Sequence, residues 1–316
     1  MEVRTQRIDY FDLMKGVCII LVVLHHCGLL HTAFLRSIRI PLYFMLSGMF
    51  FKKYSGIFEF TIRKINRLMI PWAAWMLLCY AIFHHINTPL WFLSSLFCSY
   101  LLYYCIDTLI IEKKNNRYLN IIFFVVLSFI SYELSFVHVD NNVVNIILRY
   151  FVISLATMPF FFFSSELRKN GVLSKDYSNK SLIMVGILGA IVCYFTSVSG
   201  ISYRLANFEG YPLYYFSAIG GVCAIWALCY KIKRMPYFSY MGRYSIIVLV
   251  THYPVILTMR ALHIDKWLIA VVILIVSPIL IYLLKRYAPH ITAQKDIIHY
   301  NPETRKVSVR LRSKFF

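Results

Sequence analysis

About ten long apolar segments follow one another along this chain of 316 residues, separated by short polar loops. A helix that spans a membrane needs about 20 mainly apolar residues, so about ten of them account for nearly the whole chain. Hydrophobic residues make up 59% of the sequence and charged residues 15%, against roughly 25% charged residues in soluble globular domains. So little polar surface cannot cover a water-soluble globule. The sequence therefore predicts an all-α fold, a polytopic membrane helix bundle of about ten transmembrane helices.

The positions of the helices follow from the apolar segments. The second helix is short, and we expect it to open on Pro41, since proline needs no N–H partner in a first helical turn. The expected ranges are 15–33, 38–52, 68–86, 91–110, 119–137, 146–164, 181–198, 211–230, 242–261 and 267–285.

The distribution of the basic residues sets the expected orientation. The 33 lysines and arginines against 14 acidic residues give a net charge of +19, yet they gather in alternate loops, which is typical of membrane topology rather than of nucleic-acid binding. Since cytoplasmic loops carry the excess of lysine and arginine, we expect the N-terminus and the C-terminus to be cytoplasmic. Only a few basic residues then fall in outer segments. They are Arg36, Arg39, Arg149, Arg204, Arg260 and Lys266.

The polar end of the chain is expected to lie outside the membrane. We divide the chain into a membrane domain at residues 1–285 and a basic cytoplasmic tail at residues 286–316. The tail is expected to rest on anionic lipid headgroups, at roughly 1 kcal/mol per basic residue near the surface. Alternatively, the alternating residues 306–312 form an edge strand. The eight cysteines include no CxxC pair, so the sequence indicates neither a disulfide scaffold nor a zinc site.

Histidines interrupt the apolar segments of two expected helices. His25 and His26 end an apolar run, and His26 lies ~16 Å beyond Lys15 at about 1.5 Å per residue. His252 lies ~14 Å beyond Arg243 on the same scale. Both helices run outward, so His26 and His252 are expected at similar depth, where they could face one cavity. A neutral imidazole can take a proton from a hydroxyl group and return it. The alternative is a purely structural hydrogen-bonded pair within the bundle.

Charged residues also cluster at the expected inner face. Asp12 and Lys15 are three residues apart, and Arg63 and Arg67 are four apart, so each pair shares a helix face. Arg7 precedes them. Basic residues at the inner rim of a membrane usually anchor and orient helices. Alternatively, forked guanidinium groups bind phosphates, and coenzyme A carries phosphate groups and is cytosolic.

Arg39 and Trp91 are candidates for ligand binding on the expected outer side. A tryptophan at the membrane interface ordinarily belongs to the aromatic belt. An aromatic face beside arginine would also suit a sugar.

Short motifs follow one another along most of the chain: residues 7–16 with 22–26, residues 40–48, residues 63–71, residues 91–93, and residues 242–245 with His252. In this order they resemble the motifs of the acyltransferase 3 family, in its fucose 4-O-acetylase-like branch. The family's spacing from basic residue to histidine selects His26 rather than His25. Lys15 stands where other branches have arginine, and Arg39 stands where a histidine is frequent.

The resemblance implies an integral membrane O-acyltransferase, with residues 1–285 as the membrane acyltransferase domain of a bacterial inner-membrane protein. Its co-substrate would be a cytosolic acyl-CoA, commonly acetyl-CoA, with no bound cofactor. Its acceptor would be a hydroxyl group of a surface polysaccharide or of a lipid-linked glycan precursor. No GxSxG sequence is present, which favours base-assisted transfer over a serine acyl-enzyme, and a transient acyl-histidine stays open.

The candidate residues divide by expected role. His26 acts as general base for the sugar hydroxyl or relays the acyl group, and His252 orients or stabilises it. No metal ion is expected. The acyl-CoA-binding candidates are Lys15, Arg63, Arg67 and Arg243, the supporting residues are Arg7, Asp12, Ser47 and Ser245, and the acceptor-binding candidates are Arg39 and Trp91.

Two rival functions remain open. A transporter or flippase of lipid-linked glycans would use the histidines as a proton relay and would consume no thioester. A structural partner in a polysaccharide-synthesis complex would tolerate loss of both histidines but not disruption of the tail. The sequence shows no repeat of the kind found in many transporters.

Overall fold

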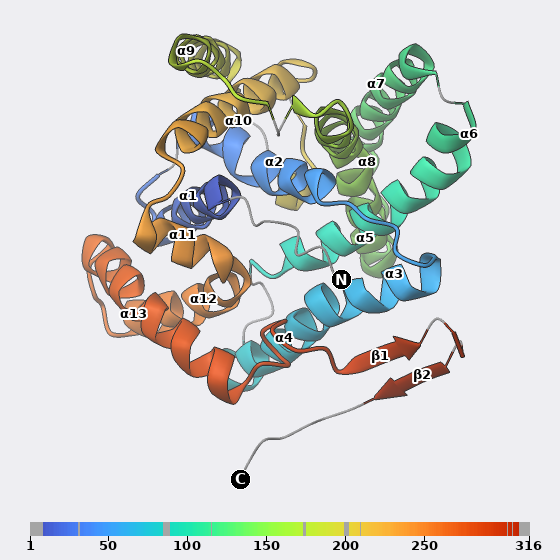
Figure 1. The fold of residues 1–316 in the computed structure, drawn as a ribbon. Coiled ribbons are helices and arrows are strands. Elements are labelled where there is room, and N and C mark those ends of the chain that lie inside the picture. Colours follow the sequence, from blue (N-terminus) through green and yellow to red (C-terminus); the bar gives the residue numbers. More distant parts are fainter. Residues whose placement is uncertain are drawn as a thin grey trace. The chain divides into compact units, whose positions relative to one another are not determined.

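The computed structural model describes residues 9–30, 32–84, 89–114, 116–172, 175–198, 202–208, 210–301, 303–304 and 306–309. Helices dominate these residues (Figure 1). In chain order they are α1 (Asp9–Cys27), α2 (Ala33–Met49), α3 (Ile57–Lys64), the π-helical turn η1 (Ile65–Met69), α4 (Ile70–Phe83), α5 (Trp91–Ile106), the π-helical turn η2 (Asp107–Ile111), α6 (Glu112–Lys114), α7 (Arg117–Leu134), α8 (Asn142–Lys169), α9 (Asn179–Thr196), the 3₁₀ turn η4 (Tyr203–Leu205), α10 (Leu213–Ile232), α11 (Pro236–Arg243), α12 (Ser245–Ala261) and α13 (Lys266–Tyr287).

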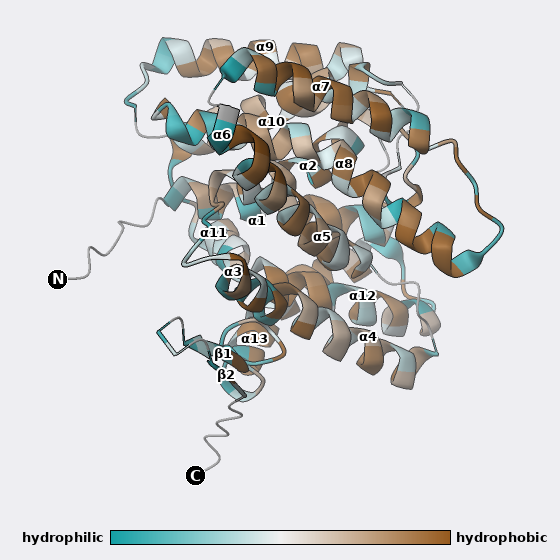
Figure 2. Ribbon diagram, turned by 90° about the vertical axis from the view of Figure 1, so that its right-hand side faces the viewer, coloured by the Kyte–Doolittle hydropathy of each residue, from teal (hydrophilic) through white to brown (hydrophobic). Residues whose placement is uncertain are grey.

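The membrane-spanning character expected from composition is confirmed. Within the described residues, eight helices are long and apolar enough to cross a membrane, and the bent pair α11 and α12 raises the number to up to nine. Figure 2 shows hydrophobic residues along most of these helices and hydrophilic residues mainly near helix ends and in connections. The expected range 38–52 corresponds to α2, which has only 17 residues. The fold is therefore an all-α, polytopic helix bundle.

Several helix starts differ from the expected ones, among them those of α1, of α2 and of the expected 68–86 helix, whose span begins at Ile57. α1 covers Asp9–Cys27, not 15–33, because Asp9 and Asp12 favour a helix N-terminus electrostatically and Gly28 leaves the helix at a φ of 90°. Consequently, the histidines of α1 lie in its last turn rather than at mid-length. Pro41 lies inside α2 rather than at its first turn, because that helix begins at Ala33.

The chain divides into two compact units. The first unit consists of Met1–Leu46, Leu167–Ile201 and Phe208–Leu280, and the second consists of Ser47–Glu166, Ser202–Asn207 and Ile281–Phe316. The first therefore contains α1, α9, α10, α11 and α12, and the second contains α3 to α7 and the C-terminal hairpin.

Two glycines bring α1 and α11 of the first unit into backbone contact. A Cβ atom on Gly16 would overlap the carbonyl oxygen of Phe238, and one on Gly242 would overlap the carbonyl oxygen of Asp12. Any larger residue at either glycine would push the helices apart, since packed interiors leave no room for an added methyl group. Directly after this contact the chain bends by 89° between α11 and α12. The contact and the bend together set where α12 starts relative to α1.

The core of the second unit is aromatic. Phe124 of α7 stacks on Phe162 of α8 with ring centroids 4.4 Å apart, and Tyr103 of α5 packs against Phe161 at 5.3 Å. The Tyr103 hydroxyl also forms a 2.7 Å hydrogen bond with Ser165. Such offset aromatic pairs contribute about 0.5–1.5 kcal/mol each beyond the area they bury.

The segment after α13 folds back onto the second unit. Strand β1 (Ile298–Asn301) pairs antiparallel with strand β2 (Lys306–Val309). Of the residues 306–312, for which an edge strand was the alternative, 306–309 form strand β2. Contact of the tail with lipid headgroups stays a prediction.

A buried asparagine holds this hairpin. Asn66, in the π-helical turn η1, is 1% exposed. Its Oδ1 accepts hydrogen bonds from the backbone N–H groups of Ile297 and Ile298, each at 2.9 Å, and its Nδ2 donates to the carbonyl of Ile298 at 2.7 Å. The Trp75 Nε1 group donates to the Ile291 carbonyl at 3.1 Å. Side chains of η1 and α4 thus satisfy the backbone of a non-helical segment.

Candidate active site

The first unit joins two histidines by a direct hydrogen bond. Nδ1 of His26, in the last turn of α1, lies 2.9 Å from Nε2 of His252, in the middle of α12. Their rings are nearly parallel, with centroids 5.1 Å apart. His252 is 1% exposed, whereas His26 is half-buried. His26 is thus the member of the pair that is accessible from outside the protein.

The backbone fixes which nitrogens carry protons. His252 Nδ1 lies 3.0 Å from the Val248 carbonyl oxygen, which can only accept a hydrogen bond. His252 Nδ1 is therefore protonated, and in the neutral ring Nε2 is an acceptor. The hydrogen between the two rings then belongs to His26 Nδ1. In this assignment by hydrogen-bond partners, a neutral His26 has its lone pair on Nε2.

Neighbouring groups hold His26 in place. The Arg260 guanidinium donates a 2.7 Å hydrogen bond to the His26 carbonyl oxygen, one of the carbonyls that a helix C-terminus leaves without an intrahelical partner. His25 Nδ1 bonds instead to the Leu30 carbonyl at 3.0 Å, within the turn that follows α1. The two adjacent histidines therefore have different surroundings. In the sequence, Arg260 was noted only as a basic residue of an outer segment, and nothing indicated its contact with His26.

The other end of α1 carries an ion pair. Arg243 Nε, at the end of α11, lies 3.4 Å from Asp12 Oδ2, and the two side chains are 40% and 5% exposed. Spacing along the helix predicted Lys15 as the residue facing Asp12. Arg243, distant in the sequence, reaches Asp12 because α1 and α11 are in contact at Gly16 and Gly242. Lys15 is half-buried on the same helix.

The remaining candidates of the first unit are placed as follows. Arg7 lies outside the described residues. Ser245 is the first residue of α12. Arg39 is only 7% exposed, and its Nε donates to the Leu35 carbonyl at 3.2 Å. Arg39 is thus buried among the helices of this unit.

Four candidates belong to the second unit. Arg63 Nε pairs with Glu59 Oε1 at 2.7 Å and its guanidinium lies 4.7 Å from the Tyr54 ring centroid. Arg67 is exposed in η1, and Trp91 is the half-buried first residue of α5. Ser47 is half-buried, and its carbonyl accepts a 3.4 Å hydrogen bond from the Tyr100 hydroxyl.

Two lysines of the second unit, Lys53 and Lys64, were not among the candidate site residues. Lys64 is 9% exposed, and its ammonium lies 3.3 Å from the Tyr100 ring centroid, a cation–π contact. Lys53 pairs with Asp107 at 2.8 Å and with Glu112 at 2.9 Å. Burial lowers the pKa of Lys53, but the two carboxylates outweigh burial and the pKa is raised. The only sequence signal was the basic cluster to which each belongs.

Comparison with known proteins supplies one match. A family model described as an acyltransferase domain, that of acyltransferase 3, matches residues 8–286. No curated protein and no solved structure matches the chain. Among the described residues no group of three or more histidine, cysteine or acidic side chains could hold a metal ion.

Proposed function

The chain belongs to the acyltransferase 3 family, whose model matches residues 8–286, and from this membership we propose that it transfers an acyl group from acyl-CoA to a hydroxyl group of a glycan. The family and the apolar helices make it a multi-pass membrane acyltransferase in the general sense. An acetyl group, a surface polysaccharide or its lipid-linked precursor, and the bacterial inner membrane are the specific parts of the proposal.

The observation that carries the proposal is the hydrogen-bond chain from Val248 through His252 to His26. It orients the imidazole of His26 and places its basic lone pair on Nε2, on the half-buried member of the pair. A general base must be held in position and must be unprotonated near neutral pH. His252 supplies the first condition as a hydrogen-bond acceptor, and it becomes a stronger partner when His26 is protonated.

The proposed reaction balances with this single base. His26 Nε2 takes the proton of the sugar hydroxyl as the sugar oxygen attacks the thioester carbonyl carbon. The new C–O bond forms, the C–S bond breaks, and the thiolate of coenzyme A leaves. The His26 imidazolium then returns the proton to that thiolate. The product is an ester and free coenzyme A, and the histidine pair regains its starting protonation.

The phosphates of acyl-CoA are proposed to bind at the opposite end of α1. Asp12 and His26 are separated by fourteen residues, or roughly 21 Å along the helix. Lys15 and Arg243 lie at the Asp12 end, and a guanidinium that is 40% exposed retains donors for phosphate oxygens. Phosphate binding by Arg63 and Arg67, in the second unit, stays a separate prediction.

The test uses membranes that contain the full chain, labelled acetyl-CoA and the host's glycans. We expect label to enter the glycan fraction with the wild type and to fall at least about 100-fold with His26→Ala, since positioned general bases contribute about 10²–10⁴-fold. The matched control is His25→Ala, which removes the adjacent ring and its bond to the Leu30 carbonyl. This variant is expected to keep most of the activity.

Two outcomes contradict the proposal. One is full transfer by correctly inserted His26→Ala protein, which removes the histidine from the chemistry. The other is silence of the wild type with a panel of acyl-CoAs and supplied acceptors together with glycan movement that depends on a proton gradient. That result would favour the transporter.

A further inference from the structure

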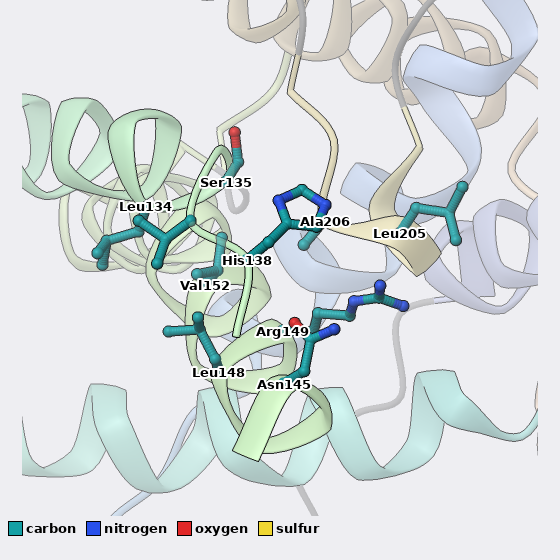
Figure 3. A pocket seen from close by; sticks show the side chains of 10 residues that line it. Leu134, Ser135, His138, Asn145, Leu148, Arg149, Val152, Leu205 and Ala206 are labelled. Carbon is teal, nitrogen blue, oxygen red and sulfur yellow. The ribbon is translucent and has the colours of Figure 1, made fainter. Parts of the chain in front are cut away.

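A cavity lies at one end of the second unit, where α7 connects to α8 (Figure 3). The space between its walls measures ≈ 280 Å³, including open solvent at its mouth. One wall is the connection between α7 and α8 with the first turns of α8, and the other is the segment with Leu205 and Ala206. All of its lining residues belong to the second unit.

The second wall is a short, tightly closed loop. Ser202 and Asn207 exchange two backbone hydrogen bonds of 2.9 and 3.0 Å, which close the loop around η4. Ala206 adopts a φ of 51°, a left-handed conformation that residues other than glycine rarely take. It is also only 3% exposed. Backbone strain of this kind is retained where surrounding contacts impose it, and it is frequent at binding sites.

Besides Ser135, three polar residues of the first wall line the cavity. Arg149 and Asn145 are four residues apart on α8 and therefore share one face of that helix. His138 precedes α8, and its Nδ1 lies 3.2 Å from the Phe136 carbonyl oxygen. Figure 3 shows the side chains of His138 and Arg149 extending toward the segment with Leu205 and Ala206. A cation, an amide and an imidazole thus converge on one space.

Arg149 is half-buried but has no ion pair or hydrogen bond with any residue that the structure describes. The forked donors of arginine match a carboxylate with two parallel hydrogen bonds. An anion bound at this point would compensate the charge.

We propose that this cavity binds a carboxylate-bearing sugar residue of the glycan acceptor. Arg149 pairs with the carboxylate, and Asn145 and His138 hydrogen-bond to ring hydroxyls. Leu148 and Val152 give the ring an apolar surface, as ligand sites usually combine apolar walls with a few polar groups.

The location of the cavity agrees with this ligand. The distribution of basic residues predicts that Arg149 and Arg204 lie on the outer side of the membrane, where surface glycans are found. That the sugar belongs to the acceptor rests on the proposed function, whereas binding of the sugar itself does not.

Calorimetric titration of the full-length chain in lipid nanodiscs tests the inference without any acyl-CoA. Sodium glucuronate is the probe, and glucose and acetate are its neutral and its ring-free counterparts. We expect glucuronate to bind the wild type at least about ten-fold more tightly than either counterpart, because a charge-assisted hydrogen bond contributes more than a neutral one. Arg149→Gln is expected to weaken glucuronate binding about ten-fold or more.

Two further variants sharpen the test. Arg204→Gln is the matched control, because Arg204 is an exposed arginine of η4 that does not line the cavity, and it is expected to bind glucuronate as the wild type does. Asn145→Leu removes an amide of similar size and is expected to weaken binding too, so it decides the question if Arg149→Gln protein is not monodisperse.

Three results would overturn the inference. They are no glucuronate binding by the wild type, equal affinity for glucose, and unchanged affinity in correctly folded Arg149→Gln and Asn145→Leu proteins. Binding of anionic phospholipid vesicles that depends on Arg149 without any glucuronate binding would assign the cavity to lipid headgroups instead. Since no acyl transfer is measured, failure here leaves the proposed function standing, and failure of transfer leaves this result standing.

Discussion

Asp12 and Arg243 form an ion pair of 3.4 Å across 231 residues of sequence. The pair exists because α1 and α11 touch at Gly16 and Gly242. Asp12, one turn before Gly16, thereby meets Arg243, which directly follows Gly242. One backbone contact therefore determines an electrostatic contact at the end of α1 where acyl-CoA is proposed to bind.

Removal of Arg243 is expected to destabilise the protein. Arg243→Gln leaves the carboxylate of Asp12, 5% exposed, without this partner, which should lower the free energy of unfolding by about 1–3 kcal/mol. Thermal unfolding in detergent measures the loss. Asp9→Asn, an exposed acidic residue in the same helical turn, is the control and should change little. Equal unfolding temperatures of Arg243→Gln and the wild type would show that the pair contributes nothing.

The glycine contact itself predicts a large effect from one methyl group. Gly16→Ala forces a Cβ atom into the backbone of Phe238, and overpacking of this kind typically lowers stability by about 1–3 kcal/mol or more. Gly186→Ala, in α9, is the matched control, because its Cβ would lie 3.6 Å from Ala227 in ordinary contact. Alanine there should stabilise the helix by roughly 0.5–1 kcal/mol. The two variants should thus shift the unfolding temperature in opposite directions, and a shared direction would contradict the packing argument.

His252 is predicted to act through His26. His252→Phe retains a ring of similar shape but removes the acceptor for His26 Nδ1, so kcat should fall by about 10²-fold or more while KM for acyl-CoA stays nearly constant. The pH dependence of kcat should also shift, because the base has lost its hydrogen-bond partner. Tyr253→Phe, at the next position of α12, is the control. A change confined to KM would assign His252 to substrate binding instead.

Asn66 is predicted to hold the C-terminal hairpin. Asn66→Leu removes the bonds to Ile297 and Ile298 and leaves half-buried backbone groups without these partners, at up to about 1–3 kcal/mol each. Hydrogen exchange at the Ile297 and Ile298 amides should then accelerate at least about ten-fold. Glu303→Gln, at an exposed position in the hairpin turn, should leave exchange at these amides unchanged. Undiminished protection in Asn66→Leu would mean that other contacts hold the strands.

The helices could be predicted because length and hydropathy are local properties of the chain. Helix ends could not, since hydropathy ignores caps: the polar start of α1 at Asp9 and its end before Gly28 depend on the helix dipole and on backbone conformation. The π-helical turn around Asn66 likewise depends on a partner far along the chain.

The histidines could be selected by sequence, but their geometry could not. Matched depth suggested a shared space for His26 and His252, whereas the direct bond depends on side-chain rotamers and on the position of the α11–α12 bend. Local spacing indicated Lys15 as the neighbour of Asp12 and gave no hint of Arg243, because an i, i+3 rule contains no information about a second helix. The cavity beside Arg149 was not foreseen for the same reason.

The hairpin on Asn66 has a consequence for the order of synthesis. Asn66 leaves the ribosome early, yet its partners at Ile297 and Ile298 are made more than two hundred residues later. Its amide must remain hydrated or find temporary partners while the intervening helices enter the membrane. The second unit therefore reaches its final structure only when nearly the whole chain has been translated, and a ribosome that stalls before this point leaves the unit incomplete.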